Sequence, residues 1–341
     1  MKKAITVLVT GVGGGSVGSQ ILKTLRNSKY HYRIIGTDIT KNSFGLSECN
    51  KSYIVPPYNK TNYISRILKI CNINKVDFIA PGTDGELLKL AQKKEVFVEK
   101  GIQILSNPYS ILKLCFNKGN LFQYLKEKKI PTPKFYIVKN LKELKKMGSP
   151  VVIKPVEGGG SRSVFLAETY EETKFFVKYL LERKIIVIIQ EYLPTLSEFT
   201  VGVIRLENGK IKRSIAMKRD LEKNLSQREV FISKKSQKRF IISSGISQGM
   251  FDDYKDIRKF CEKISDVVGA EGPLNIQCRK TSEGIIPFEI NPRFSGTTSL
   301  RSLVGFNELD FLIRYKLYNE TPPMFRLKTS YVARDLVEKV I

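Results

Sequence analysis

Short apolar runs alternate with segments of helical periodicity over about the first 110 residues. The segments at 16–27, 63–71 and 86–94 carry apolar residues three or four positions apart, as one face of a helix requires. The apolar runs between them have the length of buried strands: ITVLVTG (5–11), RIIGTDI (33–39), KSYIVP (51–56) and VDFIAPG (76–82). This alternation predicts an α/β unit over residues 1–110, built as a parallel, doubly wound, Rossmann-like sheet.

The pattern changes after about residue 110, where strands outnumber helices. A segment of helical periodicity ends at Pro131 and Pro133, because proline cannot continue a helix. The runs 198–218 and 274–294 each predict a hairpin, the first of which turns at Asn208-Gly209. The predicted divisions of this half are an α+β unit at 111–325, which contains a smaller subdomain at about 130–192, and a C-terminal segment at 326–341.

The chain is strongly basic, with 58 Lys and Arg against 33 Asp and Glu and a formal net charge of +25. Nucleic-acid binding is one interpretation, since basic surfaces attract phosphate backbones. The lysines are spread along the whole length, however, and no zinc-finger, homeodomain or RNP-type pattern occurs. Binding of an anionic nucleotide explains the charge equally well. The basic stretch 218–239 has few apolar residues, and we expect a mobile loop there.

Several features bear on the compartment of the protein. No apolar run approaches the roughly 20 residues that cross a bilayer. The start MKKAITVLVTG superficially resembles a signal peptide, but its apolar run is only about six residues long and leads directly into a glycine turn. The five cysteines are scattered, without metal-ligand spacing or a disulfide framework. We therefore expect a reduced, cytoplasmic protein that does not bind a membrane.

The first predicted strand leads into Gly13-x-Gly15-x-x-Gly18, and Asp38 follows twenty residues after the last glycine. Taken literally, this pattern is the dinucleotide fingerprint of an NAD(P)-dependent oxidoreductase. That hypothesis uses only the first domain and leaves the polar motifs of the second domain unexplained.

The densest polar pattern is EINPR (289–293), with NIQ (275–277) on the preceding strand. Side chains alternate along a strand, so Glu289, Asn291 and Arg293 share one face. A hairpin that turns at 281–284 would place Gln277 opposite Glu289. Hard oxygen donors of this kind, few in number, suit Mg²⁺ that also binds phosphate and water. The alternative is an ordinary polar face, on which a glutamate and an arginine simply pair.

A second pattern is VVIKPVEGGGSRSV (151–164). Lys154 ends an apolar run, and behind it follow Gly158, Gly159, Gly160, Ser161 and Ser163. Backbone N–H groups of three glycines can converge on anionic oxygens, and serine hydroxyls add donors. The pattern is not a Walker loop, because no Gly-Lys-Ser/Thr follows the glycines. A glycine-rich hairpin turn is the alternative.

A third pattern is QEYLPTLSEF (190–199), which ends a β-branched run with Glu191 and places Glu198 seven residues later. A backbone hinge can offer adenine a donor and an acceptor, and a carboxylate can bind the hydroxyls of a ribose. Two solvated glutamates in a loop are the alternative.

In this combination and order, the motifs resemble the ATP-grasp superfamily, in its carbamoyl-phosphate-synthase-large-subunit-like branch of carboxylate–amine ligases. The residues that carry the resemblance are Lys118, Lys154, the glycine loop, Glu191 and Glu198, Gln277, and the EINPR run. The resemblance covers nearly the whole length, because those proteins also begin with a Rossmann-like domain. It implies an ATP-grasp fold, in which two α+β subdomains clamp the nucleotide, and a glycine turn at 11–18 that lines the acceptor-substrate side.

The resemblance implies a role for each candidate residue. ATP would be bound by Lys118, Lys154, Gly158, Gly159, Gly160, Ser161, Ser163, the backbone at Glu191, Tyr192 and Leu193, and the carboxylate of Glu198. Mg²⁺ or Mn²⁺ would be gathered by Gln277, Glu289 and Asn291, and Arg293 and Lys154 would be catalytic. Substrate would meet Gly13, Gly14, Asp84 and Arg301, although Arg301 fits an ordinary helix-surface arginine equally well.

The function implied is that of an ADP-forming ligase, which joins small-molecule carboxylate and amine substrates through an acyl-phosphate. A non-catalytic nucleotide sensor of the same fold and an oxidoreductase are the alternatives. Dimerisation is common in the superfamily, but nothing in this sequence specifies an interface.

Overall fold

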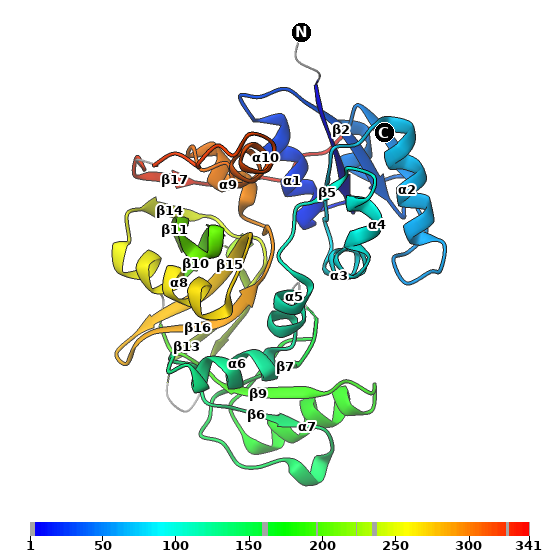
Figure 1. The fold of residues 1–341 in the computed structure, drawn as a ribbon. Coiled ribbons are helices and arrows are strands. Elements are labelled where there is room, and N and C mark those ends of the chain that lie inside the picture. Colours follow the sequence, from blue (N-terminus) through cyan, green and yellow to red (C-terminus); the bar gives the residue numbers. More distant parts are fainter. Residues whose placement is uncertain are drawn as a thin grey trace.

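The computed structural model of the chain describes residues 4–158, 163–195, 197–222, 224–233, 237–324 and 327–340. Within these ranges the strands form sheets of five, six, four and two strands. Figure 1 shows the N-terminal domain at one end of the molecule and the four-stranded sheet at the opposite end, with the six-stranded sheet between them.

The N-terminal domain is built on a parallel sheet in the order β3-β2-β1-β4-β5, which confirms the predicted doubly wound unit. Its strands are β1 (Ile5–Thr10), β2 (Tyr32–Asp38), β3 (Lys51–Ile54), β4 (Phe78–Ala80) and β5 (Gln103–Ile104). Its helices are α1 (Val17–Arg26), α2 (Tyr63–Asn74), α3 (Asp84–Gln92) and α4 (Lys94–Val98). Thr83 caps α3, because its side chain accepts a hydrogen bond from the backbone N–H of Glu86.

The two faces of this parallel sheet are covered by different parts of the chain. Val7 and Val9 pack with α1 and with α10 (Glu308–Tyr318), whereas Leu8 packs with α2 and α4 on the other face. Because α10 comes from the far end of the sequence, the N-terminal domain and the rest of the molecule share one hydrophobic core.

The central sheet is antiparallel, in the order β16-β15-β10-β11-β14-β17. Its strands are β10 (Glu198–Leu206), β11 (Ile211–Arg219), β14 (Gly249–Asp252), β15 (Pro273–Thr281), β16 (Gly284–Asn291) and β17 (Ser330–Val332). Every residue of β10 is buried, because α8 (Lys255–Val268) packs on one face of the sheet and α9 (Thr298–Leu303) and α10 lie on the other. The predicted hairpin turn at Asn208 and Gly209 is confirmed, with φ angles of 53° and 91°.

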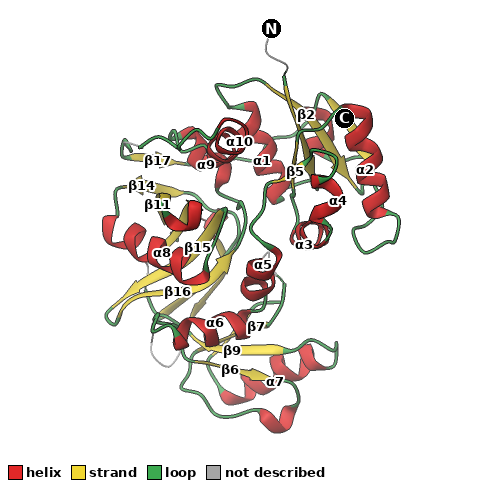
Figure 2. Cartoon of the chain, in the orientation of Figure 1, coloured by secondary structure: helices red, strands yellow, loops and turns green. Residues whose placement is uncertain are grey.

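The four-stranded sheet has the order β6-β9-β7-β8. Its elements are β6 (Phe135–Val138), β7 (Val151–Pro155), β8 (Phe165–Ala167), α7 (Tyr170–Leu181) and β9 (Val187–Glu191), and α5 (Tyr109–Phe116) and α6 (Lys118–Glu127) precede them. Figure 2 shows α7 on the outer side of this sheet, where Val177 and Leu180 pack on β7 and β9. A capping box between Thr169 and Glu172 starts α7.

The basic stretch at 218–239 differs from its sequence prediction. Instead of an irregular loop, its described residues include β12 (Gln227–Ile232), which pairs with β13 (Arg239–Ser243) in a two-stranded hairpin. Short 3₁₀ turns occur at Phe44–Glu48, Leu141–Glu143, Glu207–Gly209 and Asn224–Ser226.

Near the C-terminus, β17 pairs with β14 and extends the edge of the six-stranded sheet.

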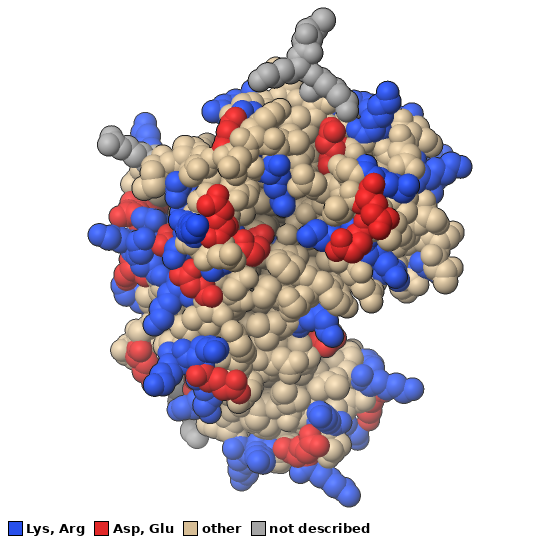
Figure 3. All heavy atoms as spheres, in the orientation of Figure 1, with Lys and Arg blue, Asp and Glu red and all other residues tan. Residues whose placement is uncertain are grey.

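Figure 3 shows basic and acidic side chains intermixed over the face of the molecule that it draws, and a hollow between the N-terminal domain and the four-stranded sheet. No helix among the described residues is long and apolar enough to span a bilayer.

Candidate functional site

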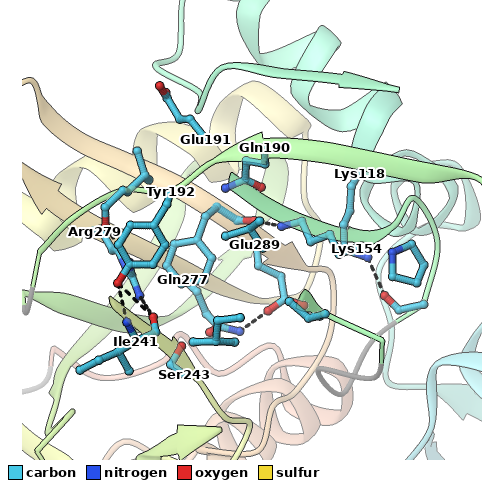
Figure 4. A pocket seen from close by; sticks show the side chains of 17 residues that line it. Lys118, Lys154, Gln190, Glu191, Tyr192, Ile241, Ser243, Gln277, Arg279 and Glu289 are labelled. Carbon is cyan, nitrogen blue, oxygen red and sulfur yellow. Dashed lines mark hydrogen bonds between the residues drawn. The ribbon is translucent and has the colours of Figure 1, made fainter. Parts of the chain in front are cut away.

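A pocket lies between the four-stranded sheet and the β15–β16 hairpin, with β13 along one side. Its polar lining comes from Lys118, Lys154, Gln190, Gln277, Arg279 and Glu289. Its apolar lining comes from Val152, Val164, Leu193, Ile241, Ile242 and Phe288. The structure therefore brings together residues from all three motifs that the sequence singled out (Figure 4).

Two lysines converge at one end of the pocket. Lys118 is the first residue of α6, and its Nζ donates a hydrogen bond to the carbonyl oxygen of Gly158 at 2.6 Å. Lys154 lies near the end of β7, and its Nζ lies 3.2 Å from the carbonyl oxygen of Phe288. Neither ammonium group forms an ion pair with a carboxylate among the described residues, and this arrangement suits an anionic ligand.

The electrostatics of the two lysines agree with that geometry. Burial and the neighbouring charge of Lys118 lower the pKa of Lys154 to about 7, although the carboxylate of Glu289 opposes the shift. Burial also lowers the pKa of Lys118, against the carboxylates of Glu289, Asp84 and Glu157. A polyanion between the two ammonium groups would reverse both shifts, because it favours their charged forms.

Gly158, the first residue of the glycine-rich segment, borders the same end of the pocket. Gly158 lines the pocket at φ 106°, a backbone conformation that favours glycine, and Ser163 has φ 55° at the other end of the loop. Gly159, Gly160 and Ser161 lie outside the described residues.

The hinge that follows β9 forms the opposite end of the pocket. The carboxylate of Glu191 accepts a hydrogen bond from the backbone N–H of Lys134 at 2.7 Å and points away from the pocket (Figure 4). The hydroxyl of Tyr192 accepts from the backbone N–H of Ile241 at 2.7 Å and donates to its carbonyl oxygen at 3.2 Å. Tyr192 is thus bound to β13, which forms a wall of the pocket.

Glu198 does not occupy the position predicted for it. The side chain is fully buried and does not line the pocket. One carboxylate oxygen lies 2.6 Å from Nη1 of Arg219, and the other lies 2.9 Å from Nε of Arg279. The expectation that this carboxylate reaches a ribose therefore does not hold in this geometry, because both oxygens are engaged inside the protein.

This buried cluster nevertheless shapes the pocket. Arg279, which Glu198 holds, donates to the carbonyl oxygen of Leu193 at 2.6 Å and to that of Ile241 at 3.0 Å. Burial alone would raise the pKa of Glu198, but the two guanidinium groups lower it below its usual range. The Glu198 cluster, which is Glu198 with Arg219 and Arg279, therefore ties the hinge to β13.

The β15–β16 hairpin has the predicted register. Gln277 lies directly opposite Glu289 and Asn275 opposite Asn291, with a bulge after Gln277, so the predicted pairing is confirmed. The amide nitrogen of Gln277 donates to Glu289 (Figure 4). Asn291 and Arg293 lie beyond the residues that line the pocket, and Nη2 of Arg293 donates to Oδ1 of Asn291 at 3.2 Å.

Arg293 has a partner that the sequence pattern did not reveal. Its Nε lies 2.5 Å from Oδ1 of Asp84, the first residue of α3, and its Nη2 lies 3.5 Å from the other carboxylate oxygen. Nη1 donates to the carbonyl oxygen of Phe294 at 3.0 Å. The N-terminal domain thus contacts the arginine of the EINPR motif directly.

The remaining substrate candidates have different outcomes. Arg301 is fully buried, with its Nη1 2.9 Å from Glu308 and its Nη2 2.5 Å from Oδ1 of Asn275, so it is neither a surface arginine nor a group open to a substrate. Gly14 is exposed with open space beside it. A Cβ at Gly13 would lie 2.8 Å from Oδ2 of Asp38, which accepts the backbone N–H of Gly13 at 2.7 Å. Asp38 is therefore used to hold the glycine turn.

The oxygen atoms at the site can be compared with the ligands that a divalent cation requires. The described residues contain no group of three or more His, Cys, Asp and Glu side chains that could hold a metal ion. Strands β15 and β16 offer the carboxylate of Glu289 and the amide oxygens of Gln277 and Asn291, with Glu289 and Gln277 on the pocket wall. So small a set fits Mg²⁺ whose other positions are filled by phosphate oxygens and water.

Sequence reasoning missed three parts of the pocket: Gln190, Arg279 and β13. Arg279 lies two residues beyond Gln277 on the same strand, so strand alternation could have placed both on one face. Tyr192 and Ile241 contact each other although they lie far apart in the chain, so no local sequence pattern could have predicted this contact.

Comparison with known proteins agrees with this architecture. The sequence matches a PylC-like N-terminal domain over residues 7–105 and an ATP-grasp domain over residues 115–297. It is 28% identical over 150 residues to a D-alanine–D-alanine ligase of Thermotoga petrophila, covering 44% of this chain and 48% of the relative. It is 23% identical over 293 residues to the carbamoyl phosphate synthase large chain of Methanocorpusculum labreanum, covering 84% of this chain and 26% of the relative. The chain thus spans about half or less of these curated relatives.

Solved structures share the fold at low identity. An L-amino acid ligase from Bacillus licheniformis superimposes with a TM-score of 0.69 at 12% identity, covering 93% of this chain and 75% of that one. An N5-carboxyaminoimidazole synthetase from Staphylococcus aureus, complexed with ADP, gives a TM-score of 0.67 at 15% identity, covering 97% and 81%.

Proposed function

The chain belongs to the ATP-grasp family, and from that premise we propose that it is an ATP- and Mg²⁺-dependent ligase that joins a carboxylate to an amine. One observation carries the proposal. Lys118 and Lys154 converge at one end of a pocket whose far wall bears Gln277 and Glu289, while its other end is an apolar slot beside a backbone hinge. A magnesium triphosphate with a planar base fits this distribution of charge.

The reaction proposed has two steps. An oxygen of the substrate carboxylate attacks the γ-phosphorus of ATP, and the bond between that phosphorus and the β–γ bridging oxygen breaks to release ADP. The amine nitrogen then attacks the acyl carbon, phosphate leaves, and the amine proton passes to phosphate or water. Catalysis of this kind depends mainly on positioning and on electrostatic stabilisation.

The two lysines are the proposed phosphate ligands. Of the two lysines, Lys154 is the one we propose to contact the transferred phosphoryl group, because it is buried and faces the part of the β15–β16 hairpin that bears Glu289. The segment 158–163 is the proposed backbone contact for the phosphates, and the backbone of the hinge at Leu193 is the proposed contact for the base. We no longer assign Glu198 to the ribose, and we propose no other side chain as a ligand of the ribose. The proposed role of Glu198 is to hold Arg279, which binds the hinge.

The proposed holders of Mg²⁺ are Glu289, the amide oxygen of Gln277 and the amide oxygen of Asn291. When bound, the ion would offset negative charge on the phosphate oxygens. The hydrogen bond from Arg293 to Asn291 fixes the position of that amide oxygen, and the amide nitrogen of Gln277 orients the Glu289 carboxylate.

Arg293 is the proposed stabiliser of the phosphoryl group in transit. Asp84 holds its guanidinium from the N-terminal domain, which limits the directions in which the remaining N–H groups can point. The acid and the amine would then meet where the glycine turn at Gly13 and Gly14 and the start of α3 face Arg293. We also retain the division into a unit near 1–110 and an ATP-grasp unit beyond it as part of the proposal.

The test is a screen of amino acids in pairs for Mg²⁺- and ATP-dependent ADP release. Glu289→Ala serves as the blank, and Glu283→Ala, an exposed glutamate at the turn of the same hairpin, is the matched control. We expect a pair-dependent ADP signal in the wild type and in Glu283→Ala, and none in Glu289→Ala. MgATP binding without ADP release for any pair would point to a nucleotide sensor, and failure to bind MgATP would overturn the proposal.

A further inference from the structure

Gln190 is a buried amide without a hydrogen-bond partner inside the candidate pocket. It is the penultimate residue of β9 and only 3% exposed, and Oε1 is a buried atom with no partner. Among the described residues, no hydrogen bond involves either end of its amide. Figure 4 shows the side chain among the lining residues, between Tyr192 on one side and the two lysines on the other.

An unpaired amide at this position requires an explanation, because a buried polar group without a partner costs free energy. The three preceding residues of β9, Val187, Ile188 and Ile189, are apolar and fully buried. Another aliphatic side chain would fill the same space without that cost. The other polar groups at this end are satisfied within the protein, since the Tyr192 hydroxyl and the Arg279 guanidinium both bind Ile241.

The surroundings of Gln190 define the chemistry of the missing partner. Val152, Leu193 and Ile242 make the nearby lining apolar, as suits the faces of an aromatic ring. A glutamine amide offers one donor and one acceptor side by side, and a half-turn of its terminal torsion exchanges them. Its partner should therefore present an acceptor beside a donor at the edge of a planar ring.

At the edge that carries N7, adenine presents such a pair and guanine does not. Adenine carries its N6 amino donor next to the N7 acceptor, to which glutamine binds in bidentate fashion, whereas guanine presents O6 and N7, two acceptors. We propose that Gln190 reads the base of the bound nucleotide and makes the pocket selective for adenine over guanine nucleotides. This inference rests on the proposed function, because it takes the pocket to be the nucleotide site.

The experiment measures the affinities of MgADP and MgGDP by titration calorimetry for the wild type, Gln190→Met and Gln103→Met. Methionine keeps the length of glutamine and removes both hydrogen-bonding groups. Gln103, on β5 of the N-terminal sheet, is the matched control because it does not line the pocket. We expect Gln190→Met to bind MgADP roughly 10- to 100-fold more weakly, the loss of one bidentate base contact. Its affinity for MgGDP should change far less, and Gln103→Met should match the wild type.

The melting temperature of each ligand-free variant gives a second reading. Replacing an unsatisfied buried amide with an apolar group of similar size should leave the melting temperature of Gln190→Met unchanged or higher. A clear decrease would show that the amide has a partner in the protein, and would overturn the inference. Retention of the wild-type preference for MgADP over MgGDP in Gln190→Met would also overturn it, while leaving the proposed function intact. A wild type that binds neither nucleotide would instead refute the proposed function.

Discussion

The Glu198 cluster offers a prediction that can be worked out from distances and burial. Substitution Glu198→Gln removes one negative charge from a site where the carboxylate is wholly buried and the side chains of Arg219 and Arg279 are 1% and 7% exposed. The ion-pair distances are 2.6 Å to Arg219 and 2.8 Å to Arg279. The variant would leave two buried guanidinium groups without a counter-charge, which is expected to cost about 3–5 kcal/mol of the free energy of unfolding.

The assay is urea denaturation at pH 7, with an exposed ion pair as control. Asp256 pairs with Lys280 at side-chain exposures of 52% and 54%, so Asp256→Asn should cost less than about 1 kcal/mol. Because Arg279 also binds Leu193 and Ile241, Glu198→Gln should in addition weaken MgADP binding. A loss of stability in Glu198→Gln no larger than in Asp256→Asn would refute the reasoning.

The pH dependence of the wild type provides a second check on the same group. The folded-state pKa of Glu198 is depressed, because the two arginines outweigh the effect of burial. Its contribution to stability is therefore complete above the ordinary glutamate pKa of about 4.3 and is lost as the pH falls through the lower, folded-state pKa. The stability difference between the wild type and Glu198→Gln should shrink over that acid range, and a constant difference would contradict the assignment.

Three further predictions concern the phosphate end of the site. With a pKa of about 7, about half of the Lys154 side chains are neutral at pH 7, so MgADP binding should be accompanied by the uptake of about half a proton per site or less. Calorimetry in buffers of different ionisation enthalpy measures this uptake, which should vanish near pH 5, where Lys154 is already charged. If Lys154→Met leaves the proton uptake unchanged, the uptake belongs to another group. Arg293→Ala should lower turnover roughly 10²- to 10³-fold in the ADP-release assay, and an unchanged rate would remove Arg293 from catalysis. Asp84→Asn, which keeps the shape and loses the charge that orients Arg293, should lower kcat roughly tenfold or more with little change in the KM for MgATP, and a KM effect alone would instead place Asp84 in substrate binding.

Much of the fold follows from local patterns in the sequence. The parallel sheet could be predicted because strands such as ITVLVTG are apolar on both faces and alternate with amphipathic helices. The register of the β15–β16 hairpin could be predicted because a short turn and the alternation of side chains leave little freedom, and Gln277 does lie opposite Glu289.

Other parts of the site depend on contacts that local patterns do not encode. Glu198 was predicted to bind the ribose of the nucleotide, but Arg219 and Arg279, 21 and 81 positions away, engage its carboxylate inside the protein. Arg301 is buried because Glu308, at the start of α10, and Asn275, on β15, bind its guanidinium, and the sequence around an arginine in a short helix does not indicate such contacts. The wall formed by β13 arises from a hairpin whose basic composition suggested a loop.

The central claim is that the pocket between the four-stranded sheet and the β15–β16 hairpin holds the nucleotide. A crystal structure with Mg²⁺ and a non-hydrolysable ATP analogue tests it most directly. The account predicts the triphosphate between Lys118, Lys154 and Glu289, with the base beside Gln190 and Leu193. A nucleotide bound at the glycine turn near Gly13, with the hairpin pocket empty, would contradict it.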